Sequence, residues 1–196
     1  DFFSPEKEKK IRGKLEEIDG KKIELKNKEM VENILKSLKN KEFYLKAIVE
    51  KEKIKNPSEP FITSTLQQDA VKRLRFSTKK TMMIAQMLYE GIDLGDMGRQ
   101  GLITYMRTDS PRISNEAIDS VREFISKKYG KDYLSNKPRQ FEGKKQAQEA
   151  HECIRPTNLE LEPDLIKEYL TNEQYLLYKM IFNRFLASQM KPAVYS

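Results

Sequence analysis

Hydrophobic residues recur every three or four positions in several parts of the chain, a spacing typical of amphipathic helices. The first such part is 29–39, with Asn27 as its N-cap. Four further helices are predicted to begin near hydroxyl residues that often cap a helix: Ser64, Ser77, Ser114 and Thr171. The second and third helices are separated by a short turn and resemble a helix-turn-helix, although helices that merely pack together show the same pattern.

Alternating hydrophobic and polar positions predict a smaller number of strands. Two short extended runs flank Asp19-Gly20, a dipeptide that favours a tight hairpin because both residues tolerate a positive φ. A further strand is expected at 43–49, and a short one at 102–106 runs into a Thr-Asp-Ser-Pro turn. The whole pattern predicts an α+β protein, with a small mixed segment first and a mainly helical part after it.

The clearest boundary in the chain is Asn56–Pro60, where two prolines follow a charged tract. We therefore place a domain change at residue 60. Two other segments are expected to be exposed loops, the glycine-rich 90–100 and the polar 131–148. The first of these loops is interpreted as an insertion next to the following segment 101–112, which carries the candidate active-site residues. The sequence does not indicate its role.

Composition limits the classes of function without choosing among them. The 196 residues are 38% hydrophobic, and 37 Lys and Arg against 30 Asp and Glu give a net charge of +7. This excess is compatible with a polyanionic partner, but many proteins that bind no nucleic acid carry as much. The single cysteine, Cys153, excludes an internal disulfide and suits a reducing cytoplasm, and no apolar run reaches membrane-spanning length. Because the chain begins at Asp1 and not at a methionine, we expect a part of a longer protein.

The stretch Gly101–Arg112 contains the residues best suited to chemistry. Side chains on a strand alternate in direction, so Tyr105, Arg107 and Asp109 are expected to share one face. A guanidinium two residues from a phenol can hold a phosphodiester by paired hydrogen bonds while the phenol oxygen approaches phosphorus. Tyr105 is therefore a candidate covalent nucleophile. Taken alone, the same tyrosine also fits an ordinary core position with a hydrogen-bonded hydroxyl.

The segment Leu102–Ser110 closely resembles the nucleophile segment of the type IA DNA topoisomerases, specifically of the bacterial topoisomerase I kind. Residues 60–68, 79–86 and 148–156 resemble further segments of this family in the same order. The resemblance covers the chain from residue 60 to its end, and the first sixty residues only by their position.

The resemblance implies a domain organisation within the α+β fold. Residues 1–60 would form part of a β-rich arch domain, and 61–190 a helical nucleophile domain with a helix-turn-helix-like pair and a short active-site strand. Residues 191–196 would begin the return to the arch, whose remaining strands follow later in the family.

The resemblance also implies a reaction. Tyr105 would attack a phosphodiester of single-stranded DNA to give a 5′-phosphotyrosine and a free 3′-hydroxyl. Another strand would pass through the gap, and the hydroxyl would then reverse the step, so that negatively supercoiled DNA is relaxed without ATP. Arg107 would stabilise the transition state, in which negative charge develops on the phosphate oxygens.

Further residues would bind DNA or tune the site. His151, the only histidine, would contact a DNA phosphate or tune Asp109 and Tyr105, although a lone histidine is often structural. Arg155 lies four residues later, on the same face if the segment is helical, and could contact phosphate or form a structural ion pair. The remaining candidates are Thr108, Arg112, Lys79 and Lys80, and the two lysines also fit a solvated helix face.

Members of the family need magnesium, which the acidic residues of a toprim domain hold. The sequence contains no Asp-x-Asp pair, so we expect Mg²⁺ to bind to the toprim domain of the parent protein and no metal to bind to this chain. The isolated chain is therefore expected to be inactive. The expected partners are single-stranded and negatively supercoiled DNA and the remaining domains of a monomeric parent protein. We expect the parent protein to lie in the cytoplasm at the nucleoid and not to bind a membrane.

Other classes of protein are compatible with parts of this pattern. Tyrosine recombinases and type IB topoisomerases also use a phenol, but their arginine and histidine residues precede a tyrosine near the C-terminus. Here Tyr105 precedes His151, and the His-x-x-x-Arg spacing differs from the His-x-x-Arg of that group. A noncatalytic basic helical module that binds DNA remains an alternative, as do topoisomerase III and reverse gyrase.

Overall fold

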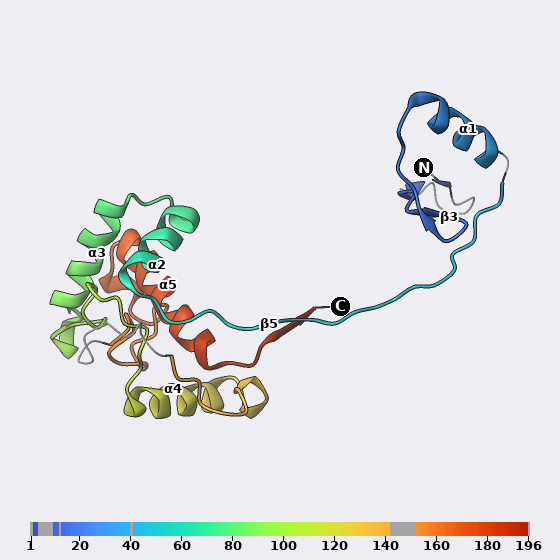
Figure 1. Cartoon of the computed structure of the whole chain (residues 1–196). Helices are drawn as coiled ribbons and strands as arrows, with labels where there is room; N and C mark the ends of the chain where they lie inside the picture. The colour runs from blue at the N-terminus through green and yellow to red at the C-terminus, as the bar shows by residue number, and fades with distance from the viewer. Residues whose placement is uncertain (1, 4–9, 12, 40, 142–151, 196) are drawn as a thin grey trace. The chain divides into compact units, whose positions relative to one another are not determined.

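The structure is a computed structural model that describes residues 2–3, 10–11, 13–39, 41–141 and 152–195. It divides into two compact units, Asp1–Val49 and Glu50–Ser196, which are described separately (Figure 1). The domain change that we place at residue 60 stays a prediction.

The first unit contains two small hairpins and one helix. Strand β1 (Phe2–Phe3) pairs antiparallel with β2 (Lys10–Ile11), and β3 (Glu17–Ile18) pairs with β4 (Lys21–Lys22). The predicted hairpin turn is confirmed, because Asp19 and Gly20 have φ values of 51° and 74°.

Helix α1 (Lys28–Leu38) begins where the cap predicts, since Asn27 Oδ1 accepts a hydrogen bond from Met30 N at 2.8 Å. The strand expected at 43–49 is wrong, because 41–52 contains no strand in the part of the chain that is described. Alternation specifies the face that a strand would bury, but a strand forms only against the backbone of a partner. Tyr44, Leu45 and Ile48 are exposed instead.

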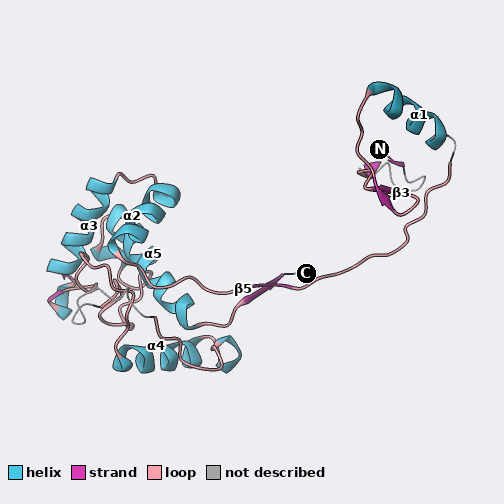
Figure 2. Cartoon of the chain, viewed as in Figure 1, coloured by secondary structure: helices cyan, strands magenta, loops and turns pink. Residues whose placement is uncertain are grey.

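The second unit is built around helix α5 (Asn172–Gln189), against which α3 (Thr78–Glu90) and α4 (Asn115–Lys128) pack (Figures 1 and 2). The predicted capping box starts α5: Gln174 N donates to Thr171 Oγ1 at 3.2 Å, and Thr171 N donates to Gln174 Oε1 at 2.9 Å. Large apolar side chains along α5 are fully buried, so this helix is the scaffold of the unit.

The helix-turn-helix-like pair is present. Helix α2 (Thr63–Asp69) continues into a π-helical turn, η1 (Ala70–Leu74), and Arg75 then takes a left-handed conformation with φ of 60°. Ser77 caps α3 as predicted, because its Oγ accepts a hydrogen bond from Lys80 N at 3.2 Å. The predicted cap at Ser64 is wrong, because α2 begins at Thr63 and its N-cap is Ile62, whose N donates to Thr65 Oγ1 at 3.1 Å.

Short elements connect these helices. The expected loop at 90–100 is a small hairpin, in which β6 (Ile92–Asp93) pairs with β7 (Arg99–Gln100) around a 3₁₀ turn, η2 (Gly95–Met97). Two other 3₁₀ turns are η3 (Lys131–Tyr133) and η4 (Lys167–Tyr169). Strands β5 (Lys53–Lys55) and β8 (Ala193–Tyr195) pair antiparallel and are exposed. Among the helices described, none is long and apolar enough to cross a membrane.

The short strand predicted at 102–106 does not form. The segment makes one isolated bridge, between Ile103 and Pro156. Thr104 N donates to Arg155 O at 2.9 Å beside this bridge, whereas Leu102 N donates to Leu88 O at 2.8 Å and Met106 O accepts a hydrogen bond from Thr63 Oγ1 at 2.8 Å. A strand needs one continuous partner, and this segment has several.

Candidate active site

Tyr105, Arg107 and Asp109 lie on the exposed side of the segment 101–112. Their side chains alternate with the buried residues Met106 and Thr108. Tyr105 itself is 44% exposed. The alternation of exposed and buried residues agrees with the sequence pattern, and the shared face of the three side chains stays a prediction because no regular strand forms. This arrangement presents a phenol, a guanidinium and a carboxylate to solvent on a backbone that is held from behind.

The first residue of α2 clamps this backbone on both sides of Arg107. Thr63 N donates to Thr108 O at 2.9 Å, and Thr108 N donates to Thr63 Oγ1 at 2.9 Å. The Thr63 hydroxyl in turn lies 2.8 Å from Met106 O and 3.0 Å from Thr108 O, and it can donate to either carbonyl. The Arg107 backbone is thus fixed without any use of its side chain. Thr63 lies within the family-like stretch 60–68, but its role was not predicted from the sequence.

Residues 152–157 support the same segment from another side. Thr104 Oγ1 donates to Cys153 O at 2.7 Å and accepts a hydrogen bond from Arg155 N at 3.0 Å. At the far end of the segment, Cys153 N donates to Arg112 O at 2.8 Å. Thr104 and Arg112 lie on either side of Tyr105 in the sequence, so residues 152–157 hold both ends of the tyrosine-bearing segment.

Arg155 forms a structural ion pair. Its Nε donates to Glu152 Oε2 at 2.8 Å, a second guanidinium nitrogen lies 2.7 Å from the same oxygen, and Nη1 donates to Pro156 O at 3.1 Å. The sequence left open whether Arg155 contacts phosphate or forms a structural ion pair, and the structure shows the ion pair. Residues 152–156 are not helical, so the condition for a helical face shared with His151 is not met in this stretch, which is held by hydrogen bonds to other segments. His151 lies outside the described residues.

Tyr89, near the C-terminal end of α3, contacts the ring of Tyr105. The two ring centroids are 5.3 Å apart and the planes are inclined by 64°, an edge-to-face arrangement. The close approach depends on Gly101, because a Cβ at this position would lie 2.8 Å from the backbone oxygen of Tyr89. The sequence offered no signal for Tyr89 beyond its position shortly after the family-like stretch 79–86.

The predicted lysines belong to a different part of the surface, at the start of α3. Lys80 pairs with Glu173 and lies over the ring of Phe76, 4.8 Å from its centroid. Lys79 is exposed, and neither lysine has an ion pair or hydrogen bond with the segment 101–112 among the residues described. The structure therefore does not bring Lys79 and Lys80 together with Tyr105 through direct contacts.

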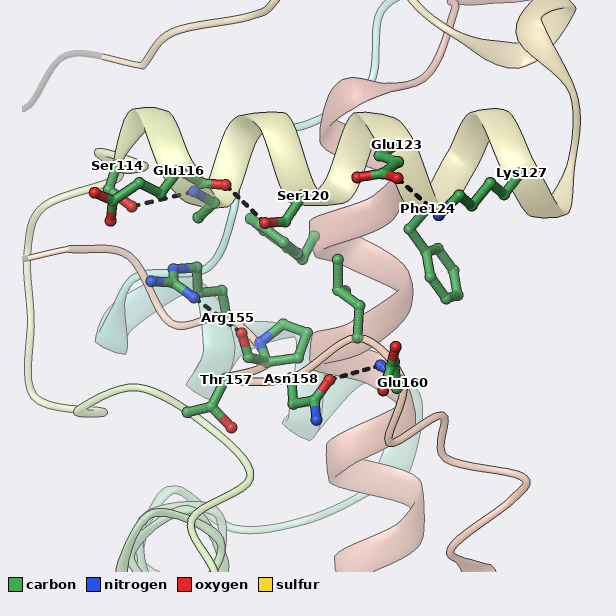
Figure 3. Close-up of a pocket in the computed structure, with 14 residues that line it drawn as sticks. Ser114, Glu116, Ser120, Glu123, Phe124, Lys127, Arg155, Thr157, Asn158 and Glu160 are labelled. Carbon is green, nitrogen blue, oxygen red and sulfur yellow. Dashed lines mark hydrogen bonds and ion pairs between the residues drawn. The ribbon is translucent and has the colours of Figure 1, made fainter.

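A cavity of about 460 Å³ lies between α4 and residues 155–160 (Figure 3). Many of its polar groups already bond to one another: Ser120 Oγ donates to Glu116 O at 2.8 Å, and Glu160 N donates to Asn158 Oδ1 at 2.9 Å. Tyr105 and Arg107 do not line this cavity. It lies beside the supporting segment and is distinct from the face that presents the tyrosine.

Cys153 is fully buried behind the tyrosine-bearing segment. Burial raises the pKa of its thiol from 9.0 to about 12, because the thiolate would lose its hydration. We therefore expect no modification of Cys153 by a thiol reagent at pH 8 in the folded protein, and complete modification in guanidinium chloride. The measurement is the time course of absorbance with an aromatic disulfide reagent. Stoichiometric reaction within seconds under native conditions would contradict this expectation.

Comparisons with known proteins show the family of this chain. A family model described as DNA topoisomerase matches residues 2–196. The structure of full-length topoisomerase I from Thermotoga maritima is similar to this chain, with 46% sequence identity and a TM-score of 0.63. That match covers 74% of this chain and 22% of the Thermotoga maritima chain, so the present chain corresponds to a limited part of the relative. The chain therefore belongs to the DNA topoisomerase family, and within it resembles the bacterial type IA topoisomerase I.

Proposed function

We propose that this chain supplies the nucleophile of a type IA DNA topoisomerase, and that Tyr105 is the attacking residue. The observation that carries this proposal is the exposed triplet Tyr105, Arg107 and Asp109 on a backbone held by Thr63 and by residues 152–157. A held backbone favours catalysis, because a nucleophile that is already oriented loses less entropy on the way to the transition state.

In the proposed reaction the Tyr105 oxygen attacks the phosphorus of a single-stranded DNA phosphodiester. The phenol gives up its proton, the bond between phosphorus and the 3′-oxygen breaks, and the 3′-oxygen leaves as a hydroxyl after taking up a proton. One phosphodiester is exchanged for another, so the bond energy is retained and no ATP is consumed. After strand passage the 3′-hydroxyl attacks the phosphotyrosine, which restores the DNA and Tyr105 and relaxes negative supercoils.

Arg107 is proposed to hold the reacting phosphate. It lies two residues from Tyr105 on the exposed side, and it has no ion pair among the residues described. A guanidinium that is free of carboxylate partners can give paired hydrogen bonds to the two nonbridging oxygens. Their charge increases in the transition state, so the contact stabilises that state more than the bound substrate. Asp109, Arg112 and His151 are proposed to bind DNA or tune this site. Thr108 is buried and its Oγ1 accepts a hydrogen bond from Ser110 N at 3.1 Å, so we propose that it tunes the site through the backbone.

The magnesium that the family requires does not fit the described part of this chain. No group of three His, Cys, Asp or Glu residues in that part is placed to hold a metal ion. We propose that Mg²⁺ is bound by the toprim domain of the parent enzyme, and no step above passes through it. The remaining domains of a monomeric parent, located in the cytoplasm at the nucleoid, are proposed as partners along with single-stranded and negatively supercoiled DNA.

A noncatalytic role in DNA binding is the second candidate for the isolated chain. Lys72, Arg75 and Lys79 are exposed around the turn between η1 and α3, and none of them has an ion pair among the residues described. These three cations can contact the phosphates of the DNA backbone without recognising the base sequence. This candidate predicts salt-dependent binding of DNA without cleavage, which the experiment below distinguishes from the catalytic proposal.

The experiment traps the covalent intermediate in a full-length enzyme, meaning this chain joined to the remaining domains of a type IA topoisomerase. The enzyme is mixed with a single-stranded oligonucleotide and magnesium and then denatured with detergent. We expect a label at the 3′ end of the oligonucleotide to stay with the protein, a label at the 5′ end to be released, and peptide mass spectrometry to place the nucleotide on Tyr105.

The isolated chain is the comparison, and we expect it to form no adduct. Retention of the 5′-labelled fragment would contradict the polarity, and an adduct on another residue would contradict the assignment of Tyr105. Cleavage by the isolated chain would show that it contains a complete site.

A further inference from the structure

Tyr105 is a half-exposed phenol whose ring has one aromatic neighbour among the described residues. Tyr89 meets it edge-to-face at 5.3 Å, and Tyr89 is itself 41% exposed. The hydroxyl of Tyr105 makes no hydrogen bond within the part of the chain that is described. Among the described residues, the ring contact with Tyr89 is therefore the aromatic contact that can restrict the orientation of the proposed nucleophile.

The backbone of Tyr89 is well placed for this role. Tyr89 occupies the last turn of α3, where Gly91 N donates to Met87 O at 3.1 Å and closes the helix. Leu102 N donates to Leu88 O at 2.8 Å, so the end of α3 is bonded directly to the start of the tyrosine-bearing segment. Gly101 allows the two backbones to meet at the carbonyl of Tyr89. These main-chain contacts hold the backbone of Tyr89 close to the start of the tyrosine-bearing segment.

We propose that Tyr89 is a positioning residue that holds the ring of Tyr105 in the orientation needed for attack on phosphorus. The inference rests on the proposed function of Tyr105. Rotation about the Cα–Cβ bond of tyrosine moves its oxygen, and an aromatic ring packed against the tyrosine ring removes orientations that point this oxygen away from the substrate. Such restriction acts on the chemical step, because it raises the fraction of complexes that are ready to react.

The hydroxyl of Tyr89 is not needed for this role, whereas its ring is. We therefore expect Tyr89→Phe to cleave DNA within about twofold of the wild-type rate, and Tyr89→Leu to cleave about three- to tenfold more slowly. The rate is measured in a single turnover at saturating oligonucleotide, in the full-length enzyme. The equilibrium dissociation constant for the same oligonucleotide is expected to stay within about twofold of wild type in both variants.

A matched control is available in the same unit. Tyr129 and Tyr133 form another aromatic pair, with centroids 6.3 Å apart, near the end of α4, and Tyr133 is 58% exposed. Tyr133→Leu removes an aromatic contact of comparable exposure that does not involve Tyr105. We expect this variant to cleave at the wild-type rate. Thermal melting of each variant shows whether it is folded. If Tyr89→Leu does not fold, Tyr89→Met takes its place, because methionine also favours a helix.

The possible results separate the two proposals. If Tyr105→Phe still forms the adduct, the proposed function is wrong. If Tyr105→Phe is inactive and Tyr89→Leu cleaves at the wild-type rate, only the positioning role is overturned. If Tyr89→Leu binds DNA more weakly but cleaves normally once saturated, Tyr89 is a DNA contact and the inference is again wrong. Slower cleavage by Tyr89→Leu with unchanged binding, together with rescue by Tyr89→Phe, supports it.

Discussion

Replacement of Tyr105 with phenylalanine is expected to abolish the covalent adduct and the relaxation of DNA in the full-length enzyme. The substitution removes only the oxygen that is proposed to attack phosphorus, and no other group can form the same ester at that position. We expect adduct formation to fall by at least about 10⁴-fold, which is below detection in a gel assay. The measurement is retention of a 3′-labelled oligonucleotide on denatured protein, beside relaxation of a supercoiled plasmid.

The fold should tolerate this change. Tyr105 is 44% exposed and its hydroxyl has no hydrogen bond within the described residues, so its removal leaves no buried group without a partner. The melting temperature is expected to match that of the wild type, and Tyr129→Phe serves as the control with a phenol removed elsewhere on the surface. Adduct formation by Tyr105→Phe would mean that another residue is the nucleophile.

Replacement of Arg107 with alanine is expected to slow cleavage by about 10²- to 10³-fold at saturating DNA, with a much smaller effect on binding. The expected loss is large because the guanidinium is proposed to meet charge that develops mainly in the transition state. The backbone should stay in place, because Thr63 binds the main chain of Met106 and Thr108 on either side of Arg107. Lysine keeps the charge but not the planar pair of donors, so Arg107→Lys should retain an intermediate rate.

Lys79→Ala is the control for Arg107→Ala, because Lys79 is a cation that would bind DNA without taking part in the chemical step. If Lys79 contacts phosphate, its loss should weaken binding and reduce the dependence of affinity on salt, while the single-turnover rate at saturation stays unchanged. Both variants are assayed by single-turnover cleavage and by equilibrium binding at several salt concentrations. Wild-type cleavage by saturated Arg107→Ala would show that Arg107 only anchors the DNA.

Local interactions explain what could be predicted from the sequence. The caps at Asn27, Ser77 and Thr171 bond to backbone amides three residues away, and the Asp19-Gly20 turn depends only on the φ angles of its own residues. These features need no other part of the chain, so the sequence places them correctly. The run Leu102–Ser110 similarly carries its chemistry in its own residue types, and its alternation predicts which side chains are exposed.

Tertiary structure decided the features that depend on distant partners. The strand expected at 43–49 did not form, and the one expected at 102–106 became an irregular segment, because a strand requires a continuous partner that alternation cannot specify. Thr63 and Thr108 are 45 residues apart in the sequence, yet their mutual hydrogen bonds hold the backbone of the site.

The sequence by itself therefore determined the helices, the caps at Asn27, Ser77 and Thr171, the family, and the alternation that exposes Tyr105, Arg107 and Asp109. Only the tertiary structure decided what surrounds that triplet: the clamp from Thr63, the ion pair that engages Arg155, and the contact of Tyr89 with the Tyr105 ring. The physical reason is that caps and turns gain their free energy within a few residues. The orientation of a side chain at the site instead depends on which distant segments pack against it.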